Sequence, residues 1–508
     1  MSATITDKFK RQLLEGMYRS FSTAYDSGTS LGDSDLYYVG ISRAEEWLDD
    51  DNPPTPYPDR ETVRIFQSSM QAVKRVTDLS YVVPRYNWSA GSIYTAWTDK
   101  NHSDTTVGAF ADIAGPYYVI TDDLNVYVCL QQGRTSEGVV RNSIYKPIDV
   151  SYEPFAAGPD GYLWKFLYNV GVYNSRRYLT SEWIPVEYVL DSSEGGMAGD
   201  ELSASRLAQI AVQQNAIEGQ ILGIEVETNG SGYATAPTIV INGSNTSPAM
   251  AYAEIDSNGS IYQVIMKEND SASLFSYGSG YGSETWITIN GGGSTQAKLR
   301  PIIHQDSGGL GYNPTKDLNS SSLMYSVRLI ADENKVFNIN NDFRQVGLIK
   351  NPNKDSASFP LFSGDSDFTA VRGTALNKLF VGSGINELNT NLDNVVTGLN
   401  SGATAYLDYY EEYVDSDCCD STQNTTKNVL YVHQTPETGF KAFDRNEVVE
   451  VSDNGGMATI QPHEDSSLPA LRFADVDKFS GDVLYIDNRV QIERDPDQTE
   501  DVKIVIDL

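Results

Sequence analysis

The stretch Asp160-Gly-Tyr-Leu-Trp-Lys-Phe-Leu-Tyr168 shows most directly how this chain folds. Asp160-Gly161 is a turn signal, and the residues after it place large side chains on both faces of a strand. A strand with bulk on both faces is expected between two layers of structure. Upstream, residues 117–120 and 125–130 flank a Thr-Asp-Asp-Leu turn and predict a β-hairpin.

Strand-like patterns recur outward from this stretch, near residues 36–41, 323–329, 483–489 and 501–506. Apolar residues at helical spacing predict helices at 5–21 and 60–76, and residues 191–218 are partly helical. The sequence therefore predicts a mainly β fold (α+β with few helices) built from multi-layer β-sandwich domains.

An internal repeat divides the middle of the chain. Residues 230–243 align without gaps, at an offset of 48, with residues 278–291, and both copies begin Gly-Ser-Gly-Tyr and end Ile-Asn-Gly. Two copies are too few for a solenoid. We predict a small repeat-bearing β insert at 203–303, and expect it to be an autonomous decoration of the body.

Composition limits the possible partners. The chain has 508 residues, with 37 Lys+Arg against 69 Asp+Glu, a formal net charge of −32. This charge disfavours nucleic acid and anionic membranes, and no apolar run approaches the length of a membrane span. Cys129 and the adjacent Cys418-Cys419 form no disulfide framework, as expected of a protein made in a reducing cytoplasm.

Sequence motifs that would indicate catalysis or metal binding are weak. Residues 28–32 match G-x-S-x-G but lack the preceding strand of a hydrolase elbow. The histidines, at 102, 304, 433 and 463, match no metal pattern and are interpreted as surface or hydrogen-bonded residues. Asp475 and Asp477 supply only the first part of a calcium loop. We predict no catalytic, cofactor-binding or metal-binding residue and no cofactor, and expect a structural protein, not an enzyme.

A series of motifs in order along the chain resembles the baseplate wedge subunit of T-even-type contractile-tailed bacteriophages, a dimeric β-sandwich protein. It includes Val83-Pro-Arg-Tyr-Asn-Trp88, the stretch at 160–168, Asn341-Asp-Phe-Arg-Gln-Val-Gly-Leu-Ile349 and Ser480-Gly-Asp-Val-Leu-Tyr-Ile-Asp-Asn-Arg489. The residues that carry the resemblance are Arg85, Trp88, Asp160, Gly161, Tyr162, Trp164, Lys165, Asn341, Asp342, Phe343, Arg344, Tyr485, Arg489 and Gln498.

The resemblance implies a subunit without an active site, which acts by geometry in a baseplate that rearranges when the tail contracts. It implies a homodimer that contacts other wedge subunits and peripheral fibre- or pin-bearing proteins, made in the host cytoplasm and located in the virion. It also implies a discontinuous body, with residues 1–88 and 370–508 as domain I and 89–369 as domain II.

Two rival functions come from other classes. A tail-associated glycan hydrolase needs paired carboxylates across a cleft, and the acidic residues here fall in turns and linkers. A tail-associated receptor- or glycan-binding module is the alternative, with Trp286 in the repeat insert as its aromatic residue. If two such acidic chains dimerise, the contact surface is expected to be poor in acidic residues and rich in apolar and tyrosine side chains.

Overall fold

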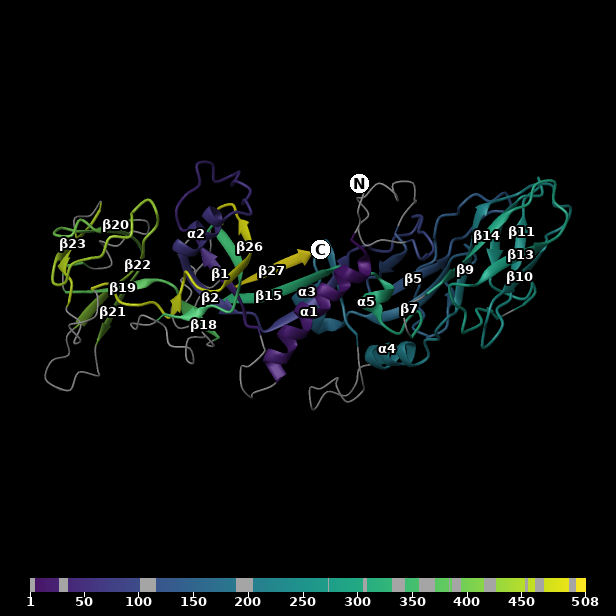
Figure 1. Cartoon of the computed structure of the whole chain (residues 1–508), viewed down its shortest axis with the longest axis horizontal. Helices are drawn as coiled ribbons and strands as arrows, with labels where there is room; N and C mark the ends of the chain where they lie inside the picture. The colour runs from purple at the N-terminus through teal and green to yellow at the C-terminus, as the bar shows by residue number, and fades with distance from the viewer. Residues whose placement is uncertain are drawn as a thin grey trace. The chain divides into compact units, whose positions relative to one another are not determined.

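The structure is a computed structural model of the whole chain (Figure 1). It describes residues 5–26, 35–100, 116–188, 204–272, 274–304, 308–330, 343–355, 371–382, 384–385, 394–414, 426–452, 456–461, 470–492 and 499–508. The segment at 28–32, His102, His463 and the cysteine pair at 418–419 lie outside these residues, as do three residues of the resemblance, Asn341, Asp342 and Gln498.

Strands predominate in the described residues, which confirms the predicted mainly β fold with few helices. The helices are α1 (Asp7–Asp26), α2 (Arg60–Ser68), α3 (Gly171–Tyr178), α4 (Ala204–Gln214) and α5 (Pro314–Asp317). The first strands are β1 (Tyr37–Ser42), β2 (Met70–Arg75), β3 (Asp78–Pro84), β4 (Tyr118–Ile120), β5 (Asn125–Gln131), β6 (Phe155–Ala156), β7 (Leu163–Asn169), β8 (Trp183–Val186) and β9 (Ile221–Thr228).

The middle strands are β10 (Thr238–Asn242), β11 (Tyr252–Ile255), β12 (Ile261–Ile265), β13 (Trp286–Asn290), β14 (Lys298–Ile303), β15 (Ser322–Ile330), β16 (Gln345–Lys350), β17 (Asn353–Lys354) and β18 (Arg372–Thr374). The last are β19 (Asn377–Val381), β20 (Val395–Gly398), β21 (Thr404–Val414), β22 (Thr426–His433), β23 (Val448–Val451), β24 (Met457–Thr459), β25 (Val476–Asp477), β26 (Asp482–Asn488) and β27 (Thr499–Asp507).

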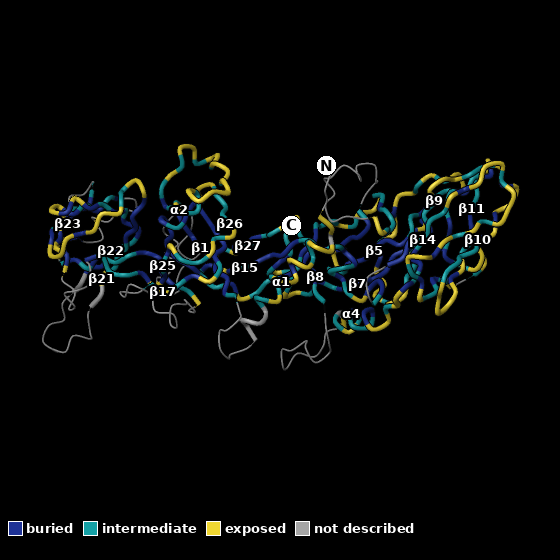
Figure 2. Tube along the Cα trace, viewed as in Figure 1, coloured by how far each residue is buried: buried dark blue, intermediate teal, exposed yellow. Residues whose placement is uncertain are grey.

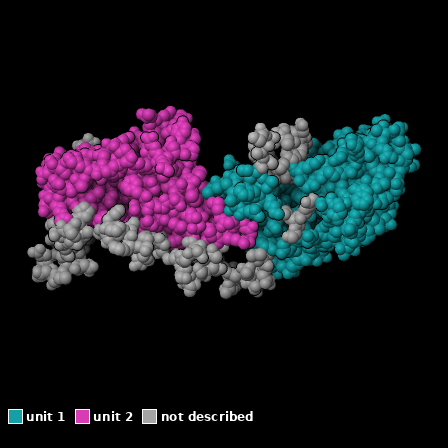
Figure 3. All heavy atoms as spheres, in the orientation of Figure 1, with its two compact units in different colours: residues 1–14, 80–324, 505–508 teal, residues 15–79, 325–504 magenta. Residues whose placement is uncertain are grey.

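The chain forms two compact units (Figure 3). Unit 1 comprises residues 1–14, 80–324 and 505–508, and unit 2 comprises residues 15–79 and 325–504. Both units are discontinuous in sequence. The units divide the chain after residues 14, 79, 324 and 504, whereas the resemblance implied boundaries after residues 88 and 369.

In unit 1, β7 lies in an antiparallel sheet of order β4-β5-β7-β6 and is buried on both faces, as its sequence predicts. Leu163 and Leu167 enter one apolar cluster with Val126 and Val128 of β5. The alternate residues Trp164 and Phe166 enter a second cluster, which Val212 of α4 joins. The strand therefore separates two cores, which is why both sets of its side chains are large and apolar.

The two copies of the repeat pair with each other. Strand β10 of the first copy and β13 of the second are antiparallel neighbours, with Thr238 opposite Asn290 and Asn242 opposite Trp286. The structure differs from the expected autonomous insert, because Ile221, Tyr233 and Ile261 belong to the same apolar cluster as Val126 of β5. The insert shares its core with the rest of unit 1.

Unit 2 contains a sheet of order β18-β2-β1-β16-β26 and a second of order β19-β22-β21-β20-β23-β24. Strand β16 lies between β1 and β26, with Gly40 of β1 opposite Gly347. A Cβ atom on Gly347 would lie 2.4 Å from the ring of Phe66 in α2, so this position requires the absence of a side chain for α2 to pack on the sheet.

The predicted helix at 60–76 is half wrong. Helix α2 begins after Asp59, whose side chain accepts a hydrogen bond from the Thr62 backbone N–H, and it ends at Ser68. Residues 70–75 instead form β2, which pairs with β1 and β18. The spacing of apolar residues in 70–75 fits either a helix or a strand. These residues form a strand because they pair with two strands that are distant in the sequence.

Candidate interaction surface

Residues 139–152, between β5 and β6, form a long connection that contains no helix and no named strand; we call it the display loop. Its large apolar side chains are 41–68% exposed, whereas the strands β5 and β7 of the same unit are mostly buried (Figure 2). The exposed side chains are Val139, Ile144, Tyr145, Ile148, Val150 and Tyr152. Exposed apolar side chains that gather into one patch mark interaction sites on proteins, which makes this loop a candidate interaction surface.

Asp160 fixes the centre of the display loop. Its carboxylate is buried and accepts hydrogen bonds from the backbone N–H groups of Ile144 (2.9 Å), Tyr145 (3.3 Å) and Tyr162 (3.2 Å). Gly161 follows at φ +87°, a conformation that favours glycine. The turn that the sequence shows at 160–161 thus holds a loop of irregular backbone as well as starting β7.

Aromatic residues hold the beginning of the loop. The hydroxyl of Tyr162 donates to the Arg141 carbonyl (2.8 Å), and the Trp88 indole N–H donates to the Ser143 hydroxyl (3.3 Å). Trp164 is fully buried and stacks on Tyr162, with ring centroids 6.0 Å apart. These contacts combine large apolar area with a polar tip that meets the backbone.

Lys165 holds the end of the loop from inside the fold. Its ammonium donates to the Tyr152 carbonyl (2.6 Å), and burial lowers the pKa of Lys165 to about 8, against the opposing charge of Asp317. Asp317 is also buried and lies 3.0 Å from His304. Burial raises the pKa of Asp317, and His304 only partly offsets this effect.

The loop is nearly free of acidic charge. It carries Arg141, Lys146 and Asp149, and Lys146 forms ion pairs with Asp122 (2.6 Å) and Asp123 (2.7 Å) outside it. The 14 residues of the loop thus carry two basic side chains and one acidic side chain, in a chain of net charge −32.

In unit 2, the resembling residues surround a different segment, residues 43–52, which we call the acidic loop. It carries Arg43 but also Glu45, Glu46, Asp49, Asp50 and Asp51. Arg344 is 2% exposed; its guanidinium donates to the Ala44 carbonyl and pairs with Asp50 at 3.3 Å.

Among the other residues of the resemblance in this unit, Arg489 contacts Arg344. Phe343 beside it is buried. The Arg489 backbone N–H donates to the Arg344 carbonyl (2.7 Å), and the Arg489 carbonyl accepts from the Trp47 indole (3.1 Å). Tyr485 lies in β26 opposite Leu348 of β16.

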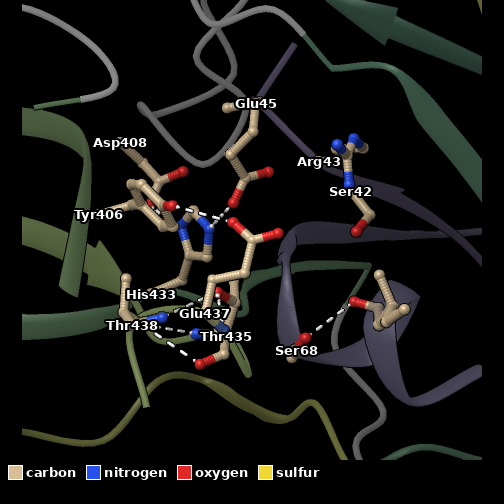
Figure 4. Close-up of polar contacts among 12 residues, drawn as sticks. Ser42, Arg43, Glu45, Ser68, Tyr406, Asp408, His433, Thr435, Glu437 and Thr438 are labelled. Carbon is tan, nitrogen blue, oxygen red and sulfur yellow. Dashed lines mark hydrogen bonds and ion pairs between the residues drawn. The ribbon is translucent and has the colours of Figure 1, made fainter. Parts of the chain in front are cut away.

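A buried histidine fixes the acidic loop to the second sheet of unit 2 (Figure 4). The imidazole of His433 lies between two carboxylates, with Nδ1 2.5 Å from Asp408 and Nε2 2.8 Å from Glu45. Burial by itself would lower the pKa of His433, but the two carboxylates outweigh it and raise the pKa to about 9. His433 is therefore a cation at neutral pH, and this cluster is an ionic clasp.

The pKa values of the two carboxylates beside His433 are shifted in opposite directions. Burial raises the pKa of Asp408, whereas the pKa of Glu45 is lowered because the hydrogen bond and charge of His433 outweigh its burial. The ammonium of Lys478, buried nearby, donates to the Ser68 carbonyl (2.9 Å), and burial lowers its pKa to about 8. Two cations and two carboxylates thus compensate one another inside the unit.

The structure places most of the resembling residues in two groups, one per unit. Arg85, which donates to the Thr180 carbonyl (2.6 Å), joins Trp88 and residues 160–165 in unit 1. No pattern in the sequence indicated that Glu45, Asp408 and Asp317 contact histidines. From the sequence, His304 and His433 are expected to be hydrogen-bonded or surface residues, and both are buried and hydrogen-bonded or ion-paired. No sequence signal links His433 to Glu45, since 388 positions separate them.

Within the part of the chain that the structure describes, no group of three or more His, Cys, Asp or Glu residues is arranged to hold a metal ion. Among the same residues, no helix is long and apolar enough to cross a membrane. No protein-family model matches the sequence, and a comparison with curated proteins found no match.

Proposed function

We propose that this chain is a structural subunit of a phage tail baseplate wedge, a homodimer that bridges neighbouring wedge subunits and fibre- or pin-bearing proteins. The display loop carries the proposal. An irregular loop that exposes apolar side chains costs conformational entropy and solvation unless it is used in a contact. In this protein, three buried polar side chains, Asp160, Tyr162 and Lys165, hold that loop in one shape.

The buried ionic clusters also support an architectural role. His304 and His433 are each less than 5% exposed, and their partners Asp317 and Asp408 are each less than 2% exposed. Groups so enclosed stabilise a shape and are not accessible to a substrate. A baseplate subunit needs this property, because its work is to hold neighbours in place while the assembly rearranges. In this proposal the chain has no enzymatic activity and needs no cofactor.

Purified tails of the phage that encodes this chain test the proposal. We expect the protein in the baseplate fraction at a fixed number of copies per tail, with cross-links to other baseplate proteins that include residues 139–152. Tails that assemble and contract normally without the protein would contradict it. So would hydrolysis of cell-wall or capsule glycan by the purified chain.

A second candidate function is receptor or glycan binding by the repeat insert. Trp286 lies on β13, an edge strand of the sheet β12-β11-β10-β13, and is 58% exposed. Exposed tryptophan is suited to stacking on a sugar ring. A glycan-array screen of the full chain tests this function: binding that Trp286→Ala abolishes would favour it, and an array without signal would reject it for the glycans presented.

A further inference from the structure

We propose that residues 53–58, the proline arm, are a preformed ligand that inserts into an aromatic-lined groove with a basic rim on a different protein. The arm lies between β1 and α2 of unit 2, directly after the acidic loop, and contains no helix and no named strand. This interaction goes beyond the proposed function, which assigns no contact to this segment.

The covalent structure of the arm holds it extended. Its sequence is Pro-Pro-Thr-Pro-Tyr-Pro, and each of these residues is either a proline or directly precedes one. A proline ring holds φ at about −65°, and the residue before a proline is restricted to extended conformations. The arm therefore favours the polyproline II conformation before a partner binds, so association costs it little conformational entropy.

Hydrogen bonds to neighbouring elements keep the arm in place. The side-chain amide of Asn488, in β26, donates to the Pro54 carbonyl (2.6 Å). The Tyr57 carbonyl accepts from the Asp59 backbone N–H (2.9 Å), and the Asp59 side chain caps α2. The arm is thus attached to a strand and to a helix of the same unit, which present it in one place.

Exposure leaves the arm open to a partner. Tyr57 is 73% exposed, and residues 51–60 are exposed apart from the half-buried Pro53 and Pro56 (Figure 2). The four prolines have no backbone N–H, so a second chain cannot pair with the arm as a regular strand. A partner therefore holds the arm by packing on its rings and donating to its carbonyls, as aromatic-lined grooves do with polyproline II segments.

Charge determines the rim of the groove. Residues 49–59 contain no Lys or Arg and four carboxylates, those of Asp49, Asp50, Asp51 and Asp59. Asp50 pairs with Arg344 inside the unit, and the other three are exposed. Basic side chains on the partner are complementary to these three carboxylates. An anionic membrane or a second proline arm would be repelled by them.

Site-specific photo-cross-linking of the full chain, in the cells that naturally make it, tests this interaction. We expect p-benzoylphenylalanine in place of Thr55 to cross-link to one other protein. Mass spectrometry and the structure of that protein should place the cross-link at a surface with Trp or Tyr beside Lys or Arg. The matched control carries the photo-reactive residue in place of Leu399, an exposed residue of unit 2 outside the arm, and should give no such product.

Two sets of variants of the cross-linking chain separate the contributions of conformation and charge. Pro54→Ala with Pro56→Ala should lower the yield about tenfold or more, because the arm loses rings and its restricted conformation. Asp49→Asn with Asp51→Asn, or added salt, should also lower the yield, since both weaken the attraction to a basic rim. Unchanged thermal unfolding verifies that each variant is folded.

Four results would overturn the role of the arm: equal yields from positions 55 and 399, a product between two copies of this chain, a partner surface without aromatic side chains, or an undiminished yield in the proline variant. The proposed function fails separately. Incorporation into baseplates without a cross-link from position 55 would overturn the role of the arm alone. The expected cross-link from a chain that is absent from tails would overturn the proposed function alone.

Discussion

The display loop and the acidic loop are both irregular segments held by buried polar side chains, but these side chains bind different groups of the two loops. The display loop carries little charge, and a carboxylate, Asp160, holds it by accepting from backbone N–H groups. The acidic loop carries five carboxylates, and the cations Arg344 and His433 hold it. The acidic loop is thus held largely through its carboxylates, whereas the display loop is held through its backbone, by the carboxylate of Asp160 and the ammonium of Lys165.

Removing a cation beneath the acidic loop should have the largest effect. Arg344→Met leaves the buried Ala44 carbonyl and the partly exposed Asp50 without this partner. We expect the free energy of unfolding to fall by about 2–3 kcal/mol, because a buried carbonyl loses a charged hydrogen-bond donor. Urea unfolding measures it. The control is Arg328→Met, which loses an exposed pair with Asp501 and should cost less than about 1 kcal/mol. Equal losses would show that Arg344 is not a central support.

Alkaline pH should release the ionic clasp. The folded pKa of His433, about 9, is above its unfolded value of 6.5. Its stabilisation is therefore complete below pH 6.5 and lost as pH rises through 9, with an upper bound of about 3 kcal/mol. Burial lowers the pKa of Lys478 to about 8, so its contribution to folding stability rises as pH increases above 8, opposite to that of His433.

Comparison with His433→Gln isolates the histidine, because this variant retains Lys478. The difference in free energy of unfolding between wild type and variant should shrink from pH 6.5 to pH 10. Faster amide exchange in residues 43–50 of the wild type should accompany the change. A difference that is constant over this range would rule out titration of the clasp.

The display loop should respond to loss of its carboxylate, with a smaller effect. In Asp160→Asn, one of the two acceptor oxygens becomes a donor that faces backbone N–H groups. We expect a loss of about 2 kcal/mol, the typical consequence of leaving a buried donor without an acceptor. Hydrogen exchange at Ile144 and Tyr145 should accelerate. Glu153→Gln, an exposed carboxylate just after the loop, serves as the control and should leave these amides protected.

The exposed ion pairs of the display loop should matter least. Lys146→Ala removes contacts with Asp122 and Asp123, which are largely exposed. The expected change in unfolding free energy is the smallest of those predicted here and decreases further with added salt. A loss as large as that of Asp160→Asn would show that ion pairs support both loops, and the contrast between them would fail.

The sequence by itself determined local structure. The hairpin of β4 and β5, the doubly buried strand β7 and the helix near the N-terminus follow from side-chain periodicity within one segment, because such patterns reflect which side of the backbone faces the core. The resemblance also directed attention to Asp160, Lys165 and Arg344, which the structure shows to be buried supports. The resemblance did not indicate which loop each of these residues holds.

The tertiary structure decided everything that depends on partners distant in the chain. Residues 70–75 are a strand because β1 and β18 bind their backbone groups, and β16 joins β1 across some 300 positions. His433 is a cation because Glu45 and Asp408 face it from two different parts of unit 2. Hydrogen bonding and desolvation act through space, so neither the end of α2 nor the charge of His433 can be predicted from a local sequence pattern.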